Sequence, residues 1–123
     1  MTTRENLLLL YIQNIYNMTV GDLPEILEFE WDEGNEQKNW IKHHVRAEEA
    51  EEPFFSEEVL ILEDKRHSTK QEARYILIGK SKKGRMLFTV YTIRKEKIRI
   101  ISSRDADRKE VLFYEKAIEP ARV

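Results

Sequence analysis

Ten cations gather within residues 74–104, and their density predicts a surface that binds negative charge. Only one acid, Glu96, lies among them. Arginine and lysine side chains bind phosphate oxygens through charge-assisted hydrogen bonds, and they suit an acidic protein partner equally well. The ten are Arg74, Lys80, Lys82, Lys83, Arg85, Arg94, Lys95, Lys97, Arg99 and Arg104.

The apolar residues between these cations predict the strands that would position them. Segments 75–78, 86–92 and 98–102 are rich in β-branched and aromatic residues, which suit a half-buried pleated sheet. The connections 80–85 and 94–97 have the length of hairpin turns. We therefore expect a three-stranded antiparallel meander fringed with cations.

The rest of the chain predicts helices and two further strands. Before the meander we expect a helix over 4–17, a break over 19–24 and a short edge strand over 27–31. A helix then runs from Asp32 or Asn35 to about Val45, and a short helix over 47–52 ends before Pro53. A strand over 59–62 follows, and after the meander Asp107 and Glu110 open a last helix. The fold class is therefore α+β, with helices packed on a mostly antiparallel sheet.

Composition narrows the class of protein. A chain of 123 residues with 41% hydrophobic content predicts one folded domain. Cysteine is absent, which excludes disulfides and thiolate chemistry. The three histidines have no clustered carboxylates at ligand spacing, so neither a metal site nor a cofactor is expected. The apolar run 7–12 is too short to span a membrane and lacks the flanks of a signal peptide, so we expect a cytoplasmic protein.

The net charge of −2 hides a strong segregation of charge. Residues 22–64 hold 15 acids and 3 bases, whereas residues 65–110 hold 15 bases and 5 acids. The first block therefore carries about −12 and the second about +10 by direct count. The two blocks either complement each other within the fold or form separate acidic and basic faces.

Seven short segments share their order and spacing with one protein family. They are FEWDE (29–33), N..KH.V (39–45), EDKRH (63–67), E.RY..IG (72–79), GR.L..VYT.R (84–94), IRIISSRDA (98–106) and E...YE (110–115). Together they resemble the BrnT family of type II toxin–antitoxin toxins over about residues 28–115. The most diagnostic part is IRIISSR followed by E...YE.

The resemblance implies a fold, an activity and a partner. The fold would be RelE-like, and the activity would be that of an endoribonuclease that inhibits translation and growth. A BrnA-like ribbon-helix-helix antitoxin would neutralise it in a dimeric or heterotetrameric complex, and operator DNA would be bound only through the antitoxin. The domain boundaries that follow are a helical extension over 1–27, a toxin domain over 28–118 and a tail over 119–123.

Three positions depart from the family pattern. His44 stands where the family usually has a glycine, which would allow a left-handed helix end. Arg46 replaces a serine that would cap the next helix, and Pro53 lies where the family continues its helix. These departures leave an alternative open, in which the protein cleaves nothing and acts as an interaction protein that binds an antitoxin or nucleic acid.

Cleavage of RNA without a metal ion needs stabilised negative charge on the phosphorane and two proton transfers. Arg94 and Arg104 are our first candidates for the phosphate, because both lie at strand ends, and Arg74 follows. The alternative for each is a solvated cation or an ion pair with the acidic helices. Further RNA contacts are assigned to Arg66, Arg85, Arg99, Lys42 and His43.

Three side chains are candidates for proton transfer. His67 follows Arg66 in a polar loop and is the preferred histidine, although a plain surface histidine would look the same. His43 could instead pack at a helix end, where the dipole favours a cation. Tyr91 would serve only if it projects from the open face of the sheet, and otherwise it belongs to the core.

Overall fold

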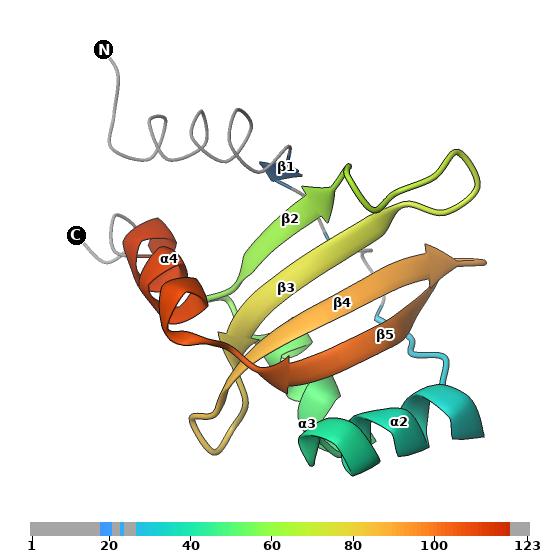
Figure 1. Ribbon diagram of the computed structural model, residues 1–123, viewed down its shortest axis with the longest axis horizontal. Helices are drawn as coiled ribbons and strands as arrows, with labels where there is room; N and C mark the ends of the chain where they lie inside the picture. Colours follow the sequence, from blue (N-terminus) through green and yellow to red (C-terminus); the bar gives the residue numbers. More distant parts are fainter. Residues whose placement is uncertain (1–17, 21–22, 24–26, 119–123) are drawn as a thin grey trace.

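The computed structural model describes residues 18–20, 23 and 27–118. The elements are β1 (Met18–Val20), α2 (Glu33–His43), α3 (Ala47–Glu51), the 3₁₀ helix η1 (Glu52–Phe55), β2 (Leu60–Asp64), β3 (Arg74–Lys80), β4 (Met86–Arg94), β5 (Lys97–Asp105) and α4 (Arg108–Ile118) (Figure 1). This arrangement confirms the predicted α+β class. The helix predicted over 4–17 lies outside the described residues.

The five strands form one sheet in the order β1-β2-β3-β4-β5, with every neighbouring pair antiparallel. The predicted meander is confirmed as β3, β4 and β5, each longer than its apolar segment. A register shift between Val90 and Tyr91 interrupts the β4–β5 pairing, as a β-bulge does.

The sheet buries both faces, because successive side chains of a strand point to opposite sides. One core cluster joins Leu77, Leu87, Tyr91, Ile98 and Ile100 of the sheet to Val45, Ala50 and Phe54. The other joins Leu60, Leu62, Ile76 and Ile78 to Tyr114 and Ile118 of α4. Figure 1 shows α4 apart from α2 and α3, which lie together. Because α4 contacts β2 and β3, it leaves Phe88 and Val90 of β4 only half-buried.

Two helices begin at the capping residues that the sequence predicted. The Asp32 side chain accepts a hydrogen bond from the Asn35 backbone, and the Asn35 side chain accepts one from the Asp32 backbone. Asp107 and Glu110 form the same reciprocal pair at α4. These bonds satisfy amide groups that a helix start leaves without partners.

The short helix α3 lies between the departures at Arg46 and Pro53. Arg46 precedes the helix and makes no side-chain capping bond. Pro53 lies in the first turn of η1, where its missing amide donor breaks no helical hydrogen bond. The segment therefore remains helical, as one short α-helix followed by a 3₁₀ turn.

His44 adopts the left-handed conformation that the family glycine suggested. Its backbone has φ 54° and ψ 40°, and its amide donates to the Trp40 carbonyl at 2.9 Å. This geometry ends α2 and turns the chain toward α3. Histidine visits this region more often than most residues with a side chain, but glycine does so without steric strain.

The outer edge of β5 is covered by the chain that precedes and forms α2. Phe29 makes a single parallel bridge with Ile98, in place of the edge strand predicted over 27–31. The Asn35 side chain donates to the Ile100 carbonyl, and the Asn39 side chain accepts from the Ser103 amide, both at 2.9 Å. These bonds satisfy backbone groups that an open edge would expose.

At the opposite edge of the sheet, beside β2, the sequence prediction was wrong. A break was expected over 19–24, but Met18–Val20 is strand β1 and pairs with Leu62–Asp64 of β2. Residues of the predicted N-terminal extension therefore complete the sheet. The pairing partner lies more than 40 residues away, so no local pattern announces it.

Candidate functional site

The antiparallel pairing of β4 and β5 places the two first candidates at opposite ends of the hairpin (Figure 1). Arg94 ends β4 and pairs with Lys97, whereas Arg104 lies opposite Phe88 near the start of β4. Arg94 lies six positions after Phe88, which corresponds to about 20 Å along a strand. Arg94 and Arg104 therefore cannot contact the same phosphate.

Two groups of side chains lie at the Arg94 end, and we name them together the His67 cluster. One group is Asp64 and His67, and the other is Glu72, Arg74 and Arg94. Glu72 accepts from Arg74 Nε through one carboxylate oxygen and from Arg94 Nη2 through the other, both at 3.3 Å. The Arg94 side chain is 52% exposed. Two arginines thus converge on one carboxylate at the surface.

His67 is held by the carboxylate of Asp64. His67 Nδ1 lies 2.6 Å from Asp64 Oδ2, and the His67 amide donates to the other oxygen. Asp64 is 6% exposed, whereas the His67 side chain is 64% exposed. A carboxylate on Nδ1 fixes the tautomer in which Nε2 accepts a proton. Nε2 has no partner among the described residues.

The loop between β2 and β3 fixes this cluster to the sheet. Ser68 Oγ donates to the Asp64 carbonyl at 2.7 Å and accepts from the Arg74 amide at 2.8 Å. One hydroxyl thus links the end of β2 to the start of β3. Arg66 precedes His67 in the same loop and is exposed, so it is the predicted RNA contact nearest in sequence to the cluster.

At the other end lies the Arg104 cluster, which comprises His43, Phe88, Arg104 and Glu110. The Arg104 guanidinium carbon lies 4.3 Å from the Phe88 ring centroid. Its two terminal nitrogens donate to the two Glu110 oxygens at 2.8 and 2.9 Å. This hydrogen-bonded pair raises the pKa of Arg104 and opposes a phosphate at the same guanidinium.

His43 lies at the end of α2, close enough to Arg104 to feel its charge. Burial, followed by the charges of Arg104 and Lys42, lowers the pKa of His43. His43 is therefore largely neutral at pH 7, and it is half-buried. Lys42 beside it is exposed. Both lie at the Arg104 end of the hairpin, and their RNA contacts stay predictions.

Arg85 serves the fold, and its predicted RNA contact is not retained. Its terminal nitrogens donate to the carbonyls of His43 and His44, both at 2.9 Å, and so cap the end of α2. The same guanidinium binds Glu49 and both oxygens of Asp105. All five N–H groups of the guanidinium are thereby used.

Arg99 is likewise occupied. It donates to Glu30 at 3.1 Å and to Asp32 at 2.7 Å, and its side chain is 18% exposed. The Asp32 hydrogen bond raises the pKa of Arg99. Arg99 thus binds the chain before α2 to the sheet. This structural role explains the cation without an RNA contact.

Tyr91 is a core residue, so the catalytic role considered for it is not retained. Its side chain is fully buried, packed edge-on against Phe54 at 5.0 Å and stacked on Tyr75 at 5.4 Å. Its hydroxyl has no hydrogen-bond partner among the described residues. Burial raises the pKa of Tyr91 far above its ordinary value, so it neither reaches RNA nor exchanges a proton with it.

Asp64 and Glu72 are the two members of the cluster that the sequence did not single out. Asp64 lies three residues before His67 and Glu72 two before Arg74, and acid–base pairs at this spacing were the available signal. The residues that the structure describes contain no group of three metal-ligating side chains. Among them, no helix combines the length and hydrophobicity that a membrane span requires.

Comparison with known proteins identifies the family. A family model described as "Ribonuclease toxin, BrnT, of type II toxin-antitoxin system" matches residues 31–110. Both clusters fall within this range. No curated protein matches the chain. Because the matched residues make up more than half of the sequence, the chain belongs to the BrnT family of ribonuclease toxins of type II toxin–antitoxin systems.

Proposed function

We propose that the protein is an endoribonuclease toxin that cleaves RNA without a metal ion at the His67 cluster. A BrnA-like ribbon-helix-helix antitoxin neutralises it, and operator DNA is bound only through that antitoxin. The observation that supports this site best is an exposed histidine that a nearly buried carboxylate holds, in the loop whose Glu72 binds two surface arginines.

His67 acts as the general base in this proposal. Asp64 holds Nδ1, so Nε2 takes the proton from the ribose 2′-hydroxyl. The 2′-oxygen then bonds to phosphorus, the bond from phosphorus to the 5′-oxygen breaks, and a 2′,3′-cyclic phosphate remains. Because the cluster is exposed, water can protonate the leaving 5′-oxygen. DNA lacks the 2′-hydroxyl and is spared.

Arg74 and Arg94 stabilise the charge that develops on the phosphorane. Guanidinium groups stay charged at any relevant pH and bind phosphate oxygens through paired donors. Glu72 occupies both arginines in the free protein at 3.3 Å. Exposed pairs of this kind contribute only about 0–1 kcal/mol, so a phosphate can displace the carboxylate.

Arg104 is not part of this reaction site. It lies about 20 Å along the hairpin from Arg94, and it can bind another phosphate of the same RNA strand only by releasing Glu110. Arg66 and Lys42 add nonspecific attraction at the two ends.

The test is cleavage of RNA by the purified protein, with and without a chelator. Cleavage that resists the chelator and leaves 2′,3′-cyclic phosphate ends is the expected result. In cells, induction should arrest growth, and co-expression of the antitoxin should restore it. Intact RNA with folded protein would contradict the enzyme and favour an interaction protein instead. Cleavage that the chelator abolishes would contradict the metal-independent route.

A further inference from the structure

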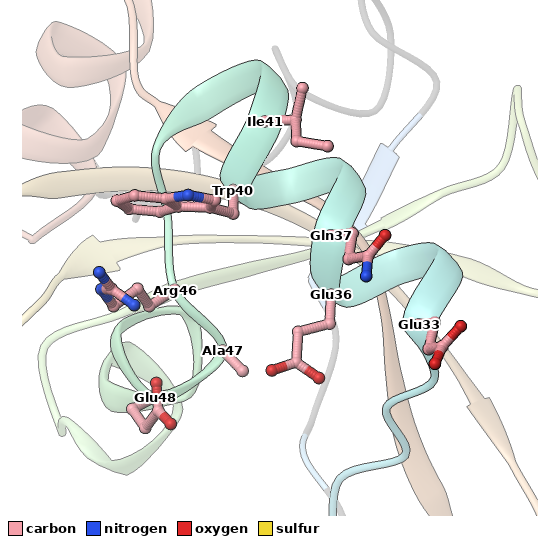
Figure 2. A pocket seen from close by; sticks show the side chains of 8 residues that line it. All are labelled: Glu33, Glu36, Gln37, Trp40, Ile41, Arg46, Ala47 and Glu48. Carbon is pink, nitrogen blue, oxygen red and sulfur yellow. The ribbon is translucent and has the colours of Figure 1, made fainter.

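A groove between α2 and α3 has no role in the proposed chemistry (Figure 2). Its volume is about 520 Å³, and its walls include Glu33, Glu36, Trp40, Ile41, Arg46 and Glu48. We name it the α2–α3 groove. A second hollow of about 450 Å³ adjoins it and shares Trp40, Arg46 and Glu48. The Trp40–Arg46 pair therefore borders both hollows.

The apolar part of this groove faces solvent and is held in place. Trp40 is 42% exposed and Ile41 is 71% exposed. The Arg46 guanidinium carbon lies 4.3 Å from the Trp40 ring centroid, and the His44 ring meets it edge-on at 5.3 Å. These contacts orient the indole before any partner arrives. Figure 2 shows the Trp40 ring on the side of Arg46 and the Ile41 side chain on another side of α2, so the groove wall carries two separate exposed apolar groups.

The polar part of the groove is acidic. Figure 2 shows Glu36 pointing from α2 toward Ala47 at the start of α3. Glu33 and Glu48 also line the groove, and none of the three forms an ion pair within the described part of the chain. Arg46, stacked on Trp40, is the one cation in the wall. Such a surface repels phosphate and attracts a basic side chain.

We propose that the α2–α3 groove is the docking surface for the antitoxin. The segment that fills it carries one apolar side chain against Trp40 and another against Ile41, next to a lysine or arginine that meets the glutamates. The inference rests on the proposed function only in taking the antitoxin as the partner. Preorganised aromatic side chains in a pocket are typical anchors of protein interfaces.

The α2–α3 groove lies away from the His67 cluster. α2 packs against β5, whereas His67 lies in the loop between β2 and β3, on the far side of the sheet order. The two regions lie well apart in Figure 1. An antitoxin segment in the groove therefore anchors the partner without itself covering the His67 cluster.

Calorimetric titration with a BrnA-like ribbon-helix-helix antitoxin tests the proposal. The groove variants are Ile41→Ser, Trp40→Ala and Glu36→Lys. The matched control is Leu112→Ser on α4, whose side chain is 49% exposed. We expect each groove variant to weaken the affinity at least tenfold and the control to leave it unchanged. Ile41 is mostly exposed, so its replacement keeps the core intact, and circular dichroism verifies the fold of each variant.

Unchanged affinity in Ile41→Ser and Glu36→Lys would overturn the proposal, and so would an equal loss in Leu112→Ser. A wild-type homodimer that Ile41→Ser dissociates would assign the groove to a second copy of this chain instead. Weaker RNA binding by the groove variants would assign it to RNA. The titration needs no ribonuclease activity. A wild-type protein that binds the antitoxin but cleaves no RNA would therefore refute only the proposed function.

Discussion

Glycine at position 44 should make the protein more stable than alanine at the same position. His44 ends α2 at φ 54° and ψ 40°, where the Cβ atom of an L-residue crowds the backbone at a cost of about 1–2 kcal/mol. Both substitutions remove the ring contact with Trp40 at 5.3 Å, so this loss cancels in the comparison. The remaining difference reports on the backbone alone.

The expected order of stability, with glycine above alanine, is unusual. At ordinary helix and strand positions glycine is less stable than alanine by roughly 0.5–1 kcal/mol, because it loses more conformational freedom on folding. Relief of the left-handed strain outweighs this loss at position 44, so His44→Gly should exceed His44→Ala by about 1 kcal/mol in the free energy of unfolding.

Urea unfolding of the two variants measures this difference directly. With a denaturant slope of about 2 kcal/mol per molar, the midpoint for His44→Gly should lie roughly 0.5 M above that for His44→Ala. Equal slopes are required, since they show that the comparison concerns stability alone. A midpoint for His44→Ala equal to or above that of His44→Gly would refute the left-handed assignment.

Three more predictions concern the fold and its response to pH. Lys95 and Glu96 both have positive φ in the β4–β5 turn. Replacing them by Asn-Gly should therefore raise the free energy of unfolding by about 1 kcal/mol, measured by urea unfolding. A loss of stability would contradict the turn geometry. Arg85→Ala should lower the free energy of unfolding by roughly 2–4 kcal/mol, because Arg85 caps α2 and binds Asp105. Arg85→Lys should lower it by nearly as much, since an ammonium group lacks the fork of a guanidinium. Wild-type stability of Arg85→Lys in urea unfolding would contradict this structural role. Because the folded-state pKa of His43 lies below its ordinary value of 6.5, its contribution is present above pH 6.5 and is lost as the pH falls through the folded-state pKa. His43→Gln should therefore lose less stability than the wild type between pH 7.5 and 5.5, and identical losses would contradict the lowered pKa.

The elements that local chemistry determines were predicted from the sequence. Asp32 and the Asp107–Glu110 pair cap their helices as expected, because a cap depends on residues three positions apart. The helix stop before Pro53 has the same local origin. Strand β1 at Met18–Val20 was missed, since its only signal is its distant partner β2.

The candidate site was predicted in its components and not in their grouping. Arg94 and Arg104 were paired because each ends a strand, but successive antiparallel strands end at opposite sides of a sheet. The predicted meander therefore already implied their separation. Tyr91 lies four positions after Leu87 on β4 and therefore on the same face of the sheet, and both belong to the buried cluster. This spacing already indicated that Tyr91 belongs to the core. The carboxylate partners of Arg85 and Arg99 come from segments 20–70 residues away, and nothing in the local sequence links them.

The most direct test compares two histidine substitutions in one RNA-cleavage assay. His67→Gln removes the proposed general base beside Asp64, and His43→Gln is the matched control at the opposite end of the hairpin. Loss of general-base catalysis reduces a rate by roughly 10²–10⁴-fold. We predict a loss of this size in His67→Gln, with the cleavage rate of His43→Gln within a few-fold of wild type. Full activity in a folded His67→Gln variant, with loss in His43→Gln, would contradict the account and move the chemistry to the Arg104 cluster.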